Sequence, residues 1–274
     1  MPMNVIIYDS EAVHANMLPL SFTRPVSDFR VGITTIAEKW QAMLPGTYSV
    51  YTAPYLREKF VLQPQPDNCF VAANVLPTPA IADAVRALPV GHGLQLPDGE
   101  IVAYRGDMES FRALAFEGGQ APMVTFTGEL PIVLHWLYDV FLNNGRAIID
   151  DFRRLTAGRT SQPVDPTVTV LGPRTLPCGT PALFIEPGAE VEACTINLKA
   201  GPVYIGREAK ILEGSCVRGP LALCDHAQVN MLAKIYADTT LGPYAKVGGE
   251  LNNVVIFGYS NKAHDGYLGN AVIG

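Results

Sequence analysis

The strongest constraint on the fold of this chain is a sequence repeat near its C-terminus. Three blocks of 18 residues follow one another without a gap, at 205–222, 223–240 and 241–258. Every sixth residue in them is aliphatic: Ile205, Ile211, Val217, Leu223, Val229, Ile235, Leu241 and Val247. Four residues after most of these, the side chain is small: Ala209, Ser215, Ala227, Ala233, Thr239 and Ala245. Such a pattern describes a three-sided coil with aliphatic residues inside, and it predicts a parallel β-helix.

The first 155 residues show a different pattern, in which short apolar strands alternate with helical segments. The expected strands are Val5–Tyr8, Ser49–Tyr51, Phe70–Ala73 and Ile101–Tyr104. The expected helices are Ile33–Leu44, Pro54–Phe60, Pro79–Leu88, Pro131–Asn143 and Ala147–Leu155. This alternation predicts an α/β domain with a doubly wound, mostly parallel sheet at residues 1–155. Gly, Pro, Thr and Ser then dominate, which indicates a linker at 156–182 before the β-helix at 183–274.

Composition excludes several classes of protein. The chain is 48% hydrophobic and 17% charged, so we expect a large core rather than disorder. A net charge of −6 gives no electrostatic reason to bind nucleic acid or anionic membranes. No apolar run approaches the roughly 18 residues of a membrane-spanning helix. The five cysteines form no CxxC motif, which favours free thiols in a reducing compartment, and we expect a cytoplasmic protein.

The repeat contains two irregularities, and it continues up to the last residue of the sequence. Asn253 stands where the period expects an aliphatic residue, and residues 259–267 are expected to loop out before Leu268 resumes the phase. An open β-helix end exposes unpaired backbone groups, so we expect further coils beyond Gly274.

The segment NNVVIFGYSNKAHDGYLGNAVIG at 252–274 carries a specific motif, a histidine three residues before Tyr-Leu-Gly. It resembles the acetyl-transfer segment of the bifunctional N-acetylglucosamine-1-phosphate uridyltransferase/glucosamine-1-phosphate acetyltransferases. The resemblance implies that His264 is the general base that deprotonates the sugar amine, and that Tyr267 helps to hold the sugar phosphate. Imidazole suits this role because its ordinary pKa lies close to neutral pH.

Two further positions follow from the same resemblance. AKIYADTTLG at 233–242 is similar to a repeat segment of the family in which a basic side chain binds the phosphate. The resemblance implies that role for Lys234. Asn252 stands where the family has a lysine, so one phosphate contact is weakened or replaced. The family also implies a left-handed β-helix, acetyl-CoA as co-substrate and a homotrimer formed through the β-helix.

The N-terminal half resembles the family less closely. Sugar nucleotidyltransferases open with a strand and a glycine-rich loop whose amides cradle phosphates. Here PLSFTRPVSDFR at 19–30 resembles the second half of that motif, which implies that Arg24 and Arg30 face nucleotide phosphates. The glycines are missing, because residues 9–16 read DSEAVHAN. Asn74 stands where the family has a magnesium-binding aspartate, which implies a weaker Mg²⁺ ligand.

The resemblance predicts a cytoplasmic transferase of sugar-nucleotide metabolism related to cell-wall precursors. Its reactions would be uridylyl transfer to a sugar 1-phosphate and acetyl transfer from acetyl-CoA to an amino-sugar 1-phosphate. Because CoA-binding coils would follow Gly274, we expect the 274-residue chain to lack acetyltransferase activity. Two alternatives remain open: a glucose-1-phosphate thymidylyltransferase-like enzyme with a structural prism, and a non-catalytic sugar-nucleotide-binding subunit. Nucleotide, sugar and acyl group are not specified by the sequence.

Overall fold

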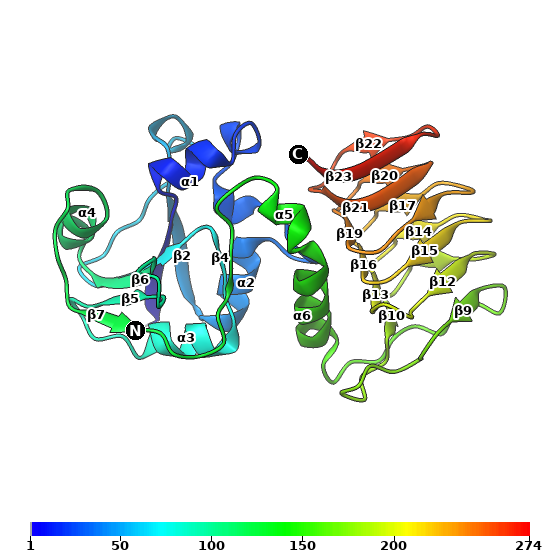
Figure 1. The fold of residues 1–274 in the computed structure, drawn as a ribbon, viewed down its shortest axis with the longest axis horizontal. Helices are drawn as coiled ribbons and strands as arrows, with labels where there is room; N and C mark the ends of the chain where they lie inside the picture. The colour runs from blue at the N-terminus through cyan, green and yellow to red at the C-terminus, as the bar shows by residue number, and fades with distance from the viewer. Residues whose placement is uncertain (1) are drawn as a thin grey trace. The chain divides into compact units, whose positions relative to one another are not determined.

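The structure is a computed structural model that describes residues 2–274, and its elements are labelled in Figure 1. The chain forms two compact units. Unit 1 comprises Met1–Phe29 and Thr35–Leu137, and unit 2 comprises Arg30–Thr34 and Tyr138–Gly274. A short piece of the N-terminal half therefore packs with the C-terminal half. In the described part of the chain, no helix is long and apolar enough to cross a membrane.

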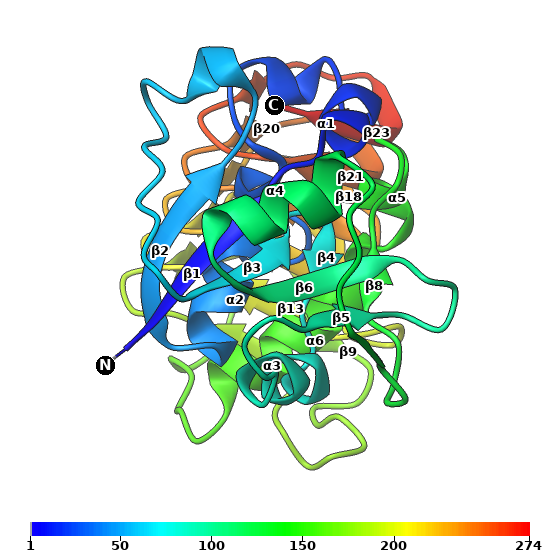
Figure 2. The same ribbon diagram turned by 90° about the vertical axis from the view of Figure 1, so that its left-hand side faces the viewer.

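Unit 1 is built on a six-stranded sheet with the order β2-β1-β3-β6-β5-β7. Its strands are β1 (Met3–Tyr8), β2 (Gly46–Tyr51), β3 (Asn68–Ala72), β5 (Gly93–Gln95), β6 (Ile101–Gly106) and β7 (Met123–Thr125). β1 lies between β2 and β3 and is parallel to both (Figure 2). β6 is antiparallel to β3 and β5. The predicted α/β head is confirmed, with antiparallel pairs added on one side of the parallel strands.

Helices and short turns connect these strands. The α-helices of unit 1 are α1 (Glu11–Asn16), α2 (Ile36–Met43), α3 (Pro79–Arg86) and α4 (Met108–Phe116). Single 3-10 turns lie at η1 (Leu20–Phe22), η2 (Val26–Asp28) and η3 (Pro54–Leu56). α2 begins at a capping box, in which the Thr35 hydroxyl accepts from the Glu38 N–H and the Glu38 carboxylate accepts from the Thr35 N–H.

Two predicted helices are wrong. The segment Pro131–Asn143 contains strand β8 (Ile132–Val133), which pairs with β4 (Val75–Leu76), and then the short helix α5 (Asp139–Leu142). Its apolar spacing fits a two-residue strand followed by a turn as well as it fits a helix, so periodicity did not separate them. The segment Pro54–Phe60 forms only the turn η3.

Unit 2 is a left-handed parallel β-helix, preceded by α5 and α6 (Asn144–Thr156), and the predicted fold is confirmed. One face holds β10 (Leu183–Ile185), β13 (Val203–Ile205), β16 (Leu221–Leu223) and β19 (Thr239–Leu241). A second holds β11 (Glu190–Val191), β14 (Lys210–Ile211), β17 (Gln228–Val229), β20 (Lys246–Val247) and β22 (Asn261–Lys262). The third holds β9 (Thr169–Leu171), β12 (Thr195–Asn197), β15 (Cys216–Arg218) and β18 (Lys234–Ile235). β21 (Glu250–Ile256) and β23 (Tyr267–Ile273) run from the third face onto the first.

The interior of the β-helix contains the residues that the repeat predicts. Ile211, Val229 and Val247 stack on consecutive strands of the second face and are buried. The small residues at the corners, such as Ala227 and Ala245, are also buried. The six-residue period therefore identifies the side chains that face the interior of the β-helix.

The structure corrects the expectation at Asn253. This residue lies at a corner with φ of 54°, a left-handed conformation that Asn adopts more readily than most residues. Its side chain donates to the Asn270 carboxamide at 3.0 Å, one coil further on. Val254 takes the interior place instead. In the next coil Lys262 lies beside Val247, so part of the segment expected to loop out keeps its strand pairing.

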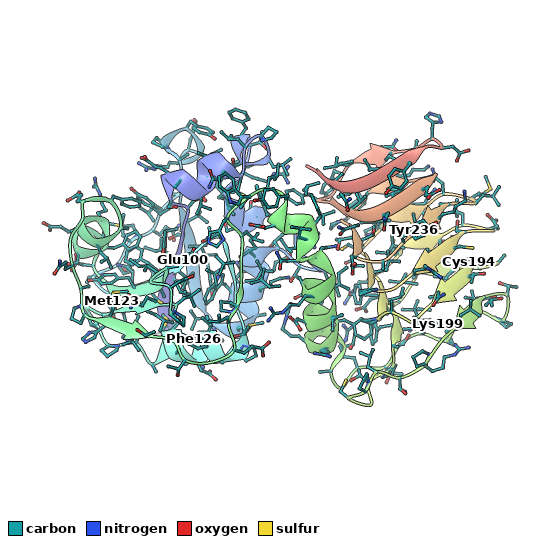
Figure 3. The ribbon with its side chains drawn as sticks, in the orientation of Figure 1. Glu100, Met123, Phe126, Cys194, Lys199 and Tyr236 are labelled. Carbon is teal, nitrogen blue, oxygen red and sulfur yellow. The ribbon has the colours of Figure 1, made fainter. Side chains whose placement is uncertain are left out.

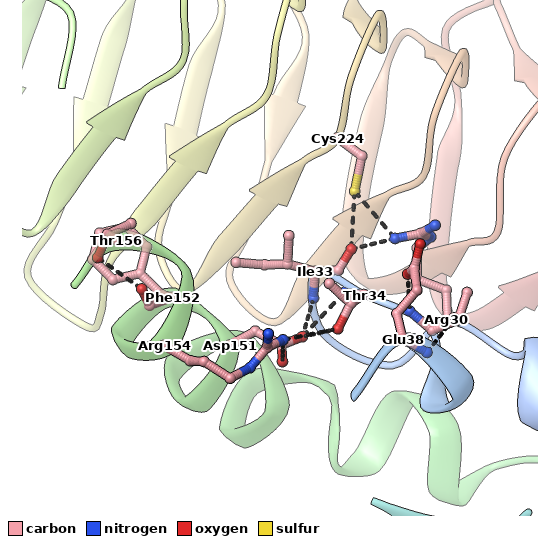
Figure 4. Close-up of polar contacts among 10 residues, drawn as sticks. Arg30, Ile33, Thr34, Glu38, Asp151, Phe152, Arg154, Thr156 and Cys224 are labelled. Atoms are coloured by element: carbon pink, nitrogen blue, oxygen red, sulfur yellow. Dashed lines mark hydrogen bonds and ion pairs between the residues drawn. The ribbon is translucent and has the colours of Figure 1, made fainter. Parts of the chain in front are cut away.

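Residues Arg30–Thr34 are anchored to α6 by one buried carboxylate (Figure 4). Oδ2 of Asp151 accepts from the backbone N–H of Ile33 at 2.8 Å and from that of Thr34 at 3.0 Å. Arg154 donates to Oδ1 at 3.0 Å. Gly32 has φ of 81°, and a Cβ there would lie 2.7 Å from the Ala147 backbone. The turn thus requires both glycine and the carboxylate.

Replacing Asp151 by Ala is expected to loosen this segment. The buried N–H of Ile33 and the partly buried N–H of Thr34 would lose a charged acceptor, a loss of about 3 kcal/mol in local stability. Hydrogen–deuterium exchange at residues 30–34 should then rise by about 10²-fold. Asp150→Ala is the matched control, since the neighbouring carboxylate is 54% exposed and its arginine contacts are 3.9 Å long. Equal exchange in both variants would contradict the assigned anchor.

Candidate functional site

A cavity of about 450 Å³ opens in unit 1 at the C-terminal ends of β1 and β2. In sheets with parallel strands, ligands bind beyond the carboxyl ends of the strands. The preferred position is the point where the strand order reverses, so that the chain continues on one side of a strand and then on the other. β1 has that position, because the chain forms β2 on one side of it and β3 on the other. The lining residues are Asp9, Glu11, His14, Ala15, Leu18, Phe22, Tyr51, Thr52, Ala53, Pro54, Tyr55, Arg57, Arg112, Phe116 and Glu117.

Several polar side chains in the cavity wall are connected by hydrogen bonds. Asp9 follows β1 directly, and its side chain is fully buried. Its Oδ2 lies 2.8 Å from Nδ1 of His14 and accepts from the Thr52 hydroxyl at 3.0 Å and the Val26 N–H at 3.3 Å. Nε2 of His14 lies 2.8 Å from the Tyr55 hydroxyl. Asp9, His14 and Tyr55 thus form a continuous hydrogen-bonded series.

Local structure explains why these groups meet. Ser10 caps α1 by accepting from the N–H of Val13 at 3.3 Å, and this starts a helix immediately after the strand. The helix places His14 back over Asp9. Tyr55 comes from η3, which follows the C-terminal end of β2. Two neighbouring parallel strands therefore deliver both ends of the series.

The remaining cavity walls combine aromatic and aliphatic side chains with charged groups of both signs: Arg57, Arg112, Glu11 and Glu117. The Tyr51 ring stacks on Phe116 with centroids 5.5 Å apart. The Arg57 guanidinium lies 4.9 Å from the Tyr51 ring centroid, and its Nε donates to the Thr52 carbonyl at 3.0 Å. Arg112 reaches the cavity from α4. Aromatic walls with a few convergent polar groups are typical of sites that bind small molecules.

The two arginines predicted to face nucleotide phosphates lie outside this lining. Arg24 lies near Asp28: burial raises the pKa of that carboxyl, and the charges of Arg24 and Lys59 offset part of the rise. Arg30 belongs to unit 2 and is 9% exposed. Its guanidinium donates to the backbone carbonyls of Ile33 and Phe257.

Asn74 is held by hydrogen bonds from its side-chain nitrogen. Its Nδ2 donates to the Leu134 carbonyl at 3.1 Å and to Oε1 of Glu100 at 3.2 Å. The other Glu100 oxygen pairs with His135 at 2.9 Å, and Glu100 is labelled in Figure 3. Mg²⁺ is coordinated by oxygen atoms, usually from one or two carboxylates together with water molecules and phosphates. Within residues 2–274, no group of three or more His, Cys, Asp or Glu side chains could hold a metal ion.

The β-helix brings three predicted residues onto its third face. Lys234 pairs in register with Glu250, which pairs with Tyr267, on the consecutive strands β18, β21 and β23. Asn252 points outward two residues after Glu250 and lies opposite Gly269. The Lys234 ammonium lies 3.7 Å from the Glu250 carboxylate. Tyr236, labelled in Figure 3, follows Lys234 by two residues on the same face.

The Tyr-Leu-Gly motif has a direct steric explanation. A Cβ on Gly269 would lie 2.2 Å from the Tyr267 hydroxyl, so the phenol ring lies across the glycine. Residues two apart on a strand share a face, and only glycine leaves room for the ring. Tyr267 is 63% exposed along this surface.

His264 lies on the exposed turn that precedes β23. The ammonium of Lys262 fastens this turn by donating to the carbonyls of Gly248 at 2.8 Å, His264 at 2.6 Å and Gly266 at 2.9 Å. The structure thus places His264 three residues before Tyr267 on a turn with a defined backbone.

Sequence reasoning missed the Asp9–His14–Tyr55 series. The available signal was a carboxylate at the end of the first strand with a histidine five residues later. Tyr55, Arg57 and Arg112 gave no such signal, because their proximity to Asp9 depends on the sheet order. Glu250 was also missed, although it precedes Asn252 by two residues and shares its face.

Replacing Lys262 by Met is expected to free the turn that carries His264. Three charge-assisted hydrogen bonds would be lost, so hydrogen–deuterium exchange at residues 263–267 should rise at least about tenfold. Lys246→Met is the control, because Lys246 is exposed on the neighbouring strand β20. Unchanged exchange in Lys262→Met would show that the turn is held by other contacts.

Comparison with known proteins gives the head a family. Residues 5–160 match the sugar nucleotidyl transferase family, a range that includes the cavity and its polar series. No curated protein matches the chain. A sugar nucleotidyl transferase acts on a sugar phosphate and a nucleotide. Since the match covers more than half of the 274 residues, the chain belongs to the sugar nucleotidyl transferase family.

Proposed function

We propose that the cavity at the ends of β1 and β2 binds a nucleoside triphosphate and that unit 1 transfers its nucleotidyl group to a sugar 1-phosphate. The observation that carries this proposal is the position of the cavity, at the edge where parallel strands present ligands. The nucleotide proposed is UTP and the product a UDP-linked N-acetylamino sugar, in line with the resemblance of residues 19–30 and 252–274.

The chemistry is a substitution at phosphorus. An oxygen of the sugar 1-phosphate attacks the α-phosphorus and forms a new P–O bond, and the bond to the β-phosphate oxygen breaks. Pyrophosphate leaves with that electron pair. Negative charge accumulates on the leaving group, and Arg57 and Arg112 are the cavity cations that would offset it. Any Mg²⁺ is proposed to bind through the nucleotide phosphates rather than through Asn74.

Replacing Arg57 or Arg112 by Gln is expected to lower kcat/KM for sugar-nucleotide formation by about 10- to 100-fold. Mass spectrometry of the product, with N-acetylglucosamine 1-phosphate and a panel of nucleoside triphosphates, measures the effect. Arg86→Gln is the matched control, because Arg86 is an exposed arginine on α3 that pairs with Asp83 and lies outside the cavity lining.

The panel also separates the alternatives. Turnover with dTTP and glucose 1-phosphate alone would replace the uridylyl proposal by a thymidylyltransferase. Nucleotide binding without any turnover would support a non-catalytic binding subunit and contradict nucleotidyl transfer. A loss of activity in Arg86→Gln equal to that in the cavity variants would show that the cavity is not the site.

We also propose that the third face of the β-helix binds an amino-sugar 1-phosphate and presents it for acetyl transfer from acetyl-CoA. The supporting observation is that Lys234, Asn252 and Tyr267 lie on adjacent strands of this face. Lys234 would attract the phosphate and Tyr267 would donate to it. His264, on the turn held by Lys262, would remove a proton from the amine.

Binding of glucosamine 1-phosphate to this chain tests the third face without requiring acetyl-CoA. Lys234→Met should weaken binding about tenfold, because it removes the cation nearest the phosphate. Lys210→Met is a matched control, since Lys210 also pairs with a glutamate, Glu190 at 2.9 Å, but lies on the second face. Calorimetry showing equal affinity for both variants would contradict this site.

The homotrimer that the resemblance implies is also a proposal. Sedimentation equilibrium of the chain measures its mass directly, and a species of three times 29.6 kDa is the expected result. A monomer would mean that the β-helix of this chain does not assemble by itself.

A further inference from the structure

We propose that the carboxylate of Glu117 accepts hydrogen bonds from two adjacent hydroxyl groups on a sugar ring of the ligand. The inference rests on the proposed function in one respect, namely that a ligand with a sugar ring and phosphates enters the cavity. Both the ribose of a nucleotide and the pyranose of a sugar phosphate carry such a pair of hydroxyl groups.

The charges in the cavity lining do not fit a site for phosphates alone. The lining contains two guanidinium groups, from Arg57 and Arg112, and three carboxylates, from Asp9, Glu11 and Glu117. An ionised carboxylate only accepts hydrogen bonds, so it repels a phosphate and binds groups that carry an O–H or N–H donor. We therefore expect the ligand to present phosphates to one part of the lining and hydroxyl groups to another.

Two of the three carboxylates have an explanation within the protein. Oδ2 of Asp9 lies within hydrogen-bond distance of groups from three other segments of the head. Glu11 lies in the first turn of α1, where the partial positive charge of the helix N-terminus stabilises a carboxylate. Glu117 has neither kind of support. Within residues 2–274, no hydrogen bond or ion pair engages its carboxylate.

The position of Glu117 in its helix is electrostatically unfavourable. Glu117 is the C-cap of α4, and the last turn of this helix contains no basic residue. The C-terminus of a helix carries a partial negative charge, which destabilises a carboxylate beside it. The backbone there is fixed, because the N–H groups of Glu117 and Gly119 donate to the Ala113 carbonyl at 3.2 and 2.8 Å. Residues that break a local rule in this way are expected at functional sites, where a ligand supplies the missing contact.

The neighbours of Glu117 favour hydroxyl groups as the donors. Phe116 precedes it, is 39% exposed and stacks on Tyr51, and all three residues line the cavity. A base or sugar ring that packs against Phe116 would bring the hydroxyl groups of the ligand next to the carboxylate. Hydrogen bonds from hydroxyl groups to a carboxylate are short and strong. In dinucleotide-binding domains an acidic side chain likewise binds the ribose 2′-hydroxyl.

Calorimetry with UTP, 2′-deoxyuridine triphosphate and N-acetylglucosamine 1-phosphate tests this contact. Glu117→Gln keeps the shape of the side chain and removes its negative charge. Loss of the charge alone would strengthen binding of these anionic ligands, whereas loss of the hydroxyl acceptor should weaken binding about tenfold. The sign of the change thus separates a direct contact from a general electrostatic effect. Glu109→Gln is the matched control, because Glu109 is an exposed glutamate in the first turn of α4 and lies outside the cavity lining.

The ligands also identify which sugar ring is bound. If it is the ribose, wild type should bind UTP about tenfold more tightly than the 2′-deoxy analogue, and Glu117→Gln should remove this preference. If it is the pyranose, Glu117→Gln should weaken binding of N-acetylglucosamine 1-phosphate and not of UTP. Equal or tighter binding of all three ligands by Glu117→Gln, or the same loss in Glu109→Gln, would overturn the proposal.

Failure of this inference is distinguishable from failure of the proposed function. Unchanged ligand binding and normal sugar-nucleotide formation by Glu117→Gln would leave nucleotidyl transfer in place and remove Glu117 from the site. Ligand binding that depends on Glu117, without formation of a sugar nucleotide by wild type, would support the hydroxyl contact and contradict the proposed reaction.

Discussion

The buried carboxylate of Asp9 is the interaction on which the architecture of the head depends. It joins four separate segments: the end of β1, helix α1 through His14, the backbone at Val26 and the residue after β2, Thr52. Each contact satisfies a polar group that would otherwise be buried without a partner. Asp9, His14 and Thr52 also line the cavity, so the contacts that hold the strand ends together determine which polar groups the cavity contains. Asp9 therefore contributes both to the stability of the head and to the shape of the cavity in which we propose that a nucleotide binds.

The β-helix places side chains at fixed intervals on its faces. Its coils repeat every 18 residues in the regular region, so a residue and its counterpart one coil later lie on neighbouring strands, about 4.8 Å apart. Lys234 and Glu250 become neighbours in this way although 16 positions separate them. Interior packing of residues such as Ile235 and Leu251 fixes the register, and the outward positions remain available for binding.

The fold could be predicted from the sequence where buried residues recur at a regular interval. It could not be predicted where two residues come close only because of the order of the strands in the sheet. The six-residue phase of Ile211, Val229 and Val247 identified the interior, and Lys234, Asn252 and Tyr267 lie outside it. The cavity was not predictable, because Asp9 and Tyr55 are 46 positions apart and meet only once β1 and β2 pair. Arg30 was assigned by motif similarity, whereas the structure uses it to bond the carbonyls of Ile33 and Phe257.

The central claim is that the cavity beside β1 and β2 is the nucleotide site, and a crystal structure of the chain with a non-hydrolysable UTP analogue tests it most directly. The account predicts electron density for the phosphates within hydrogen-bond distance of Arg57 and Arg112, with the base against the aromatic wall formed by Tyr51 and Phe116. Density for the nucleotide elsewhere on unit 1, with this cavity empty at saturating analogue, would contradict it.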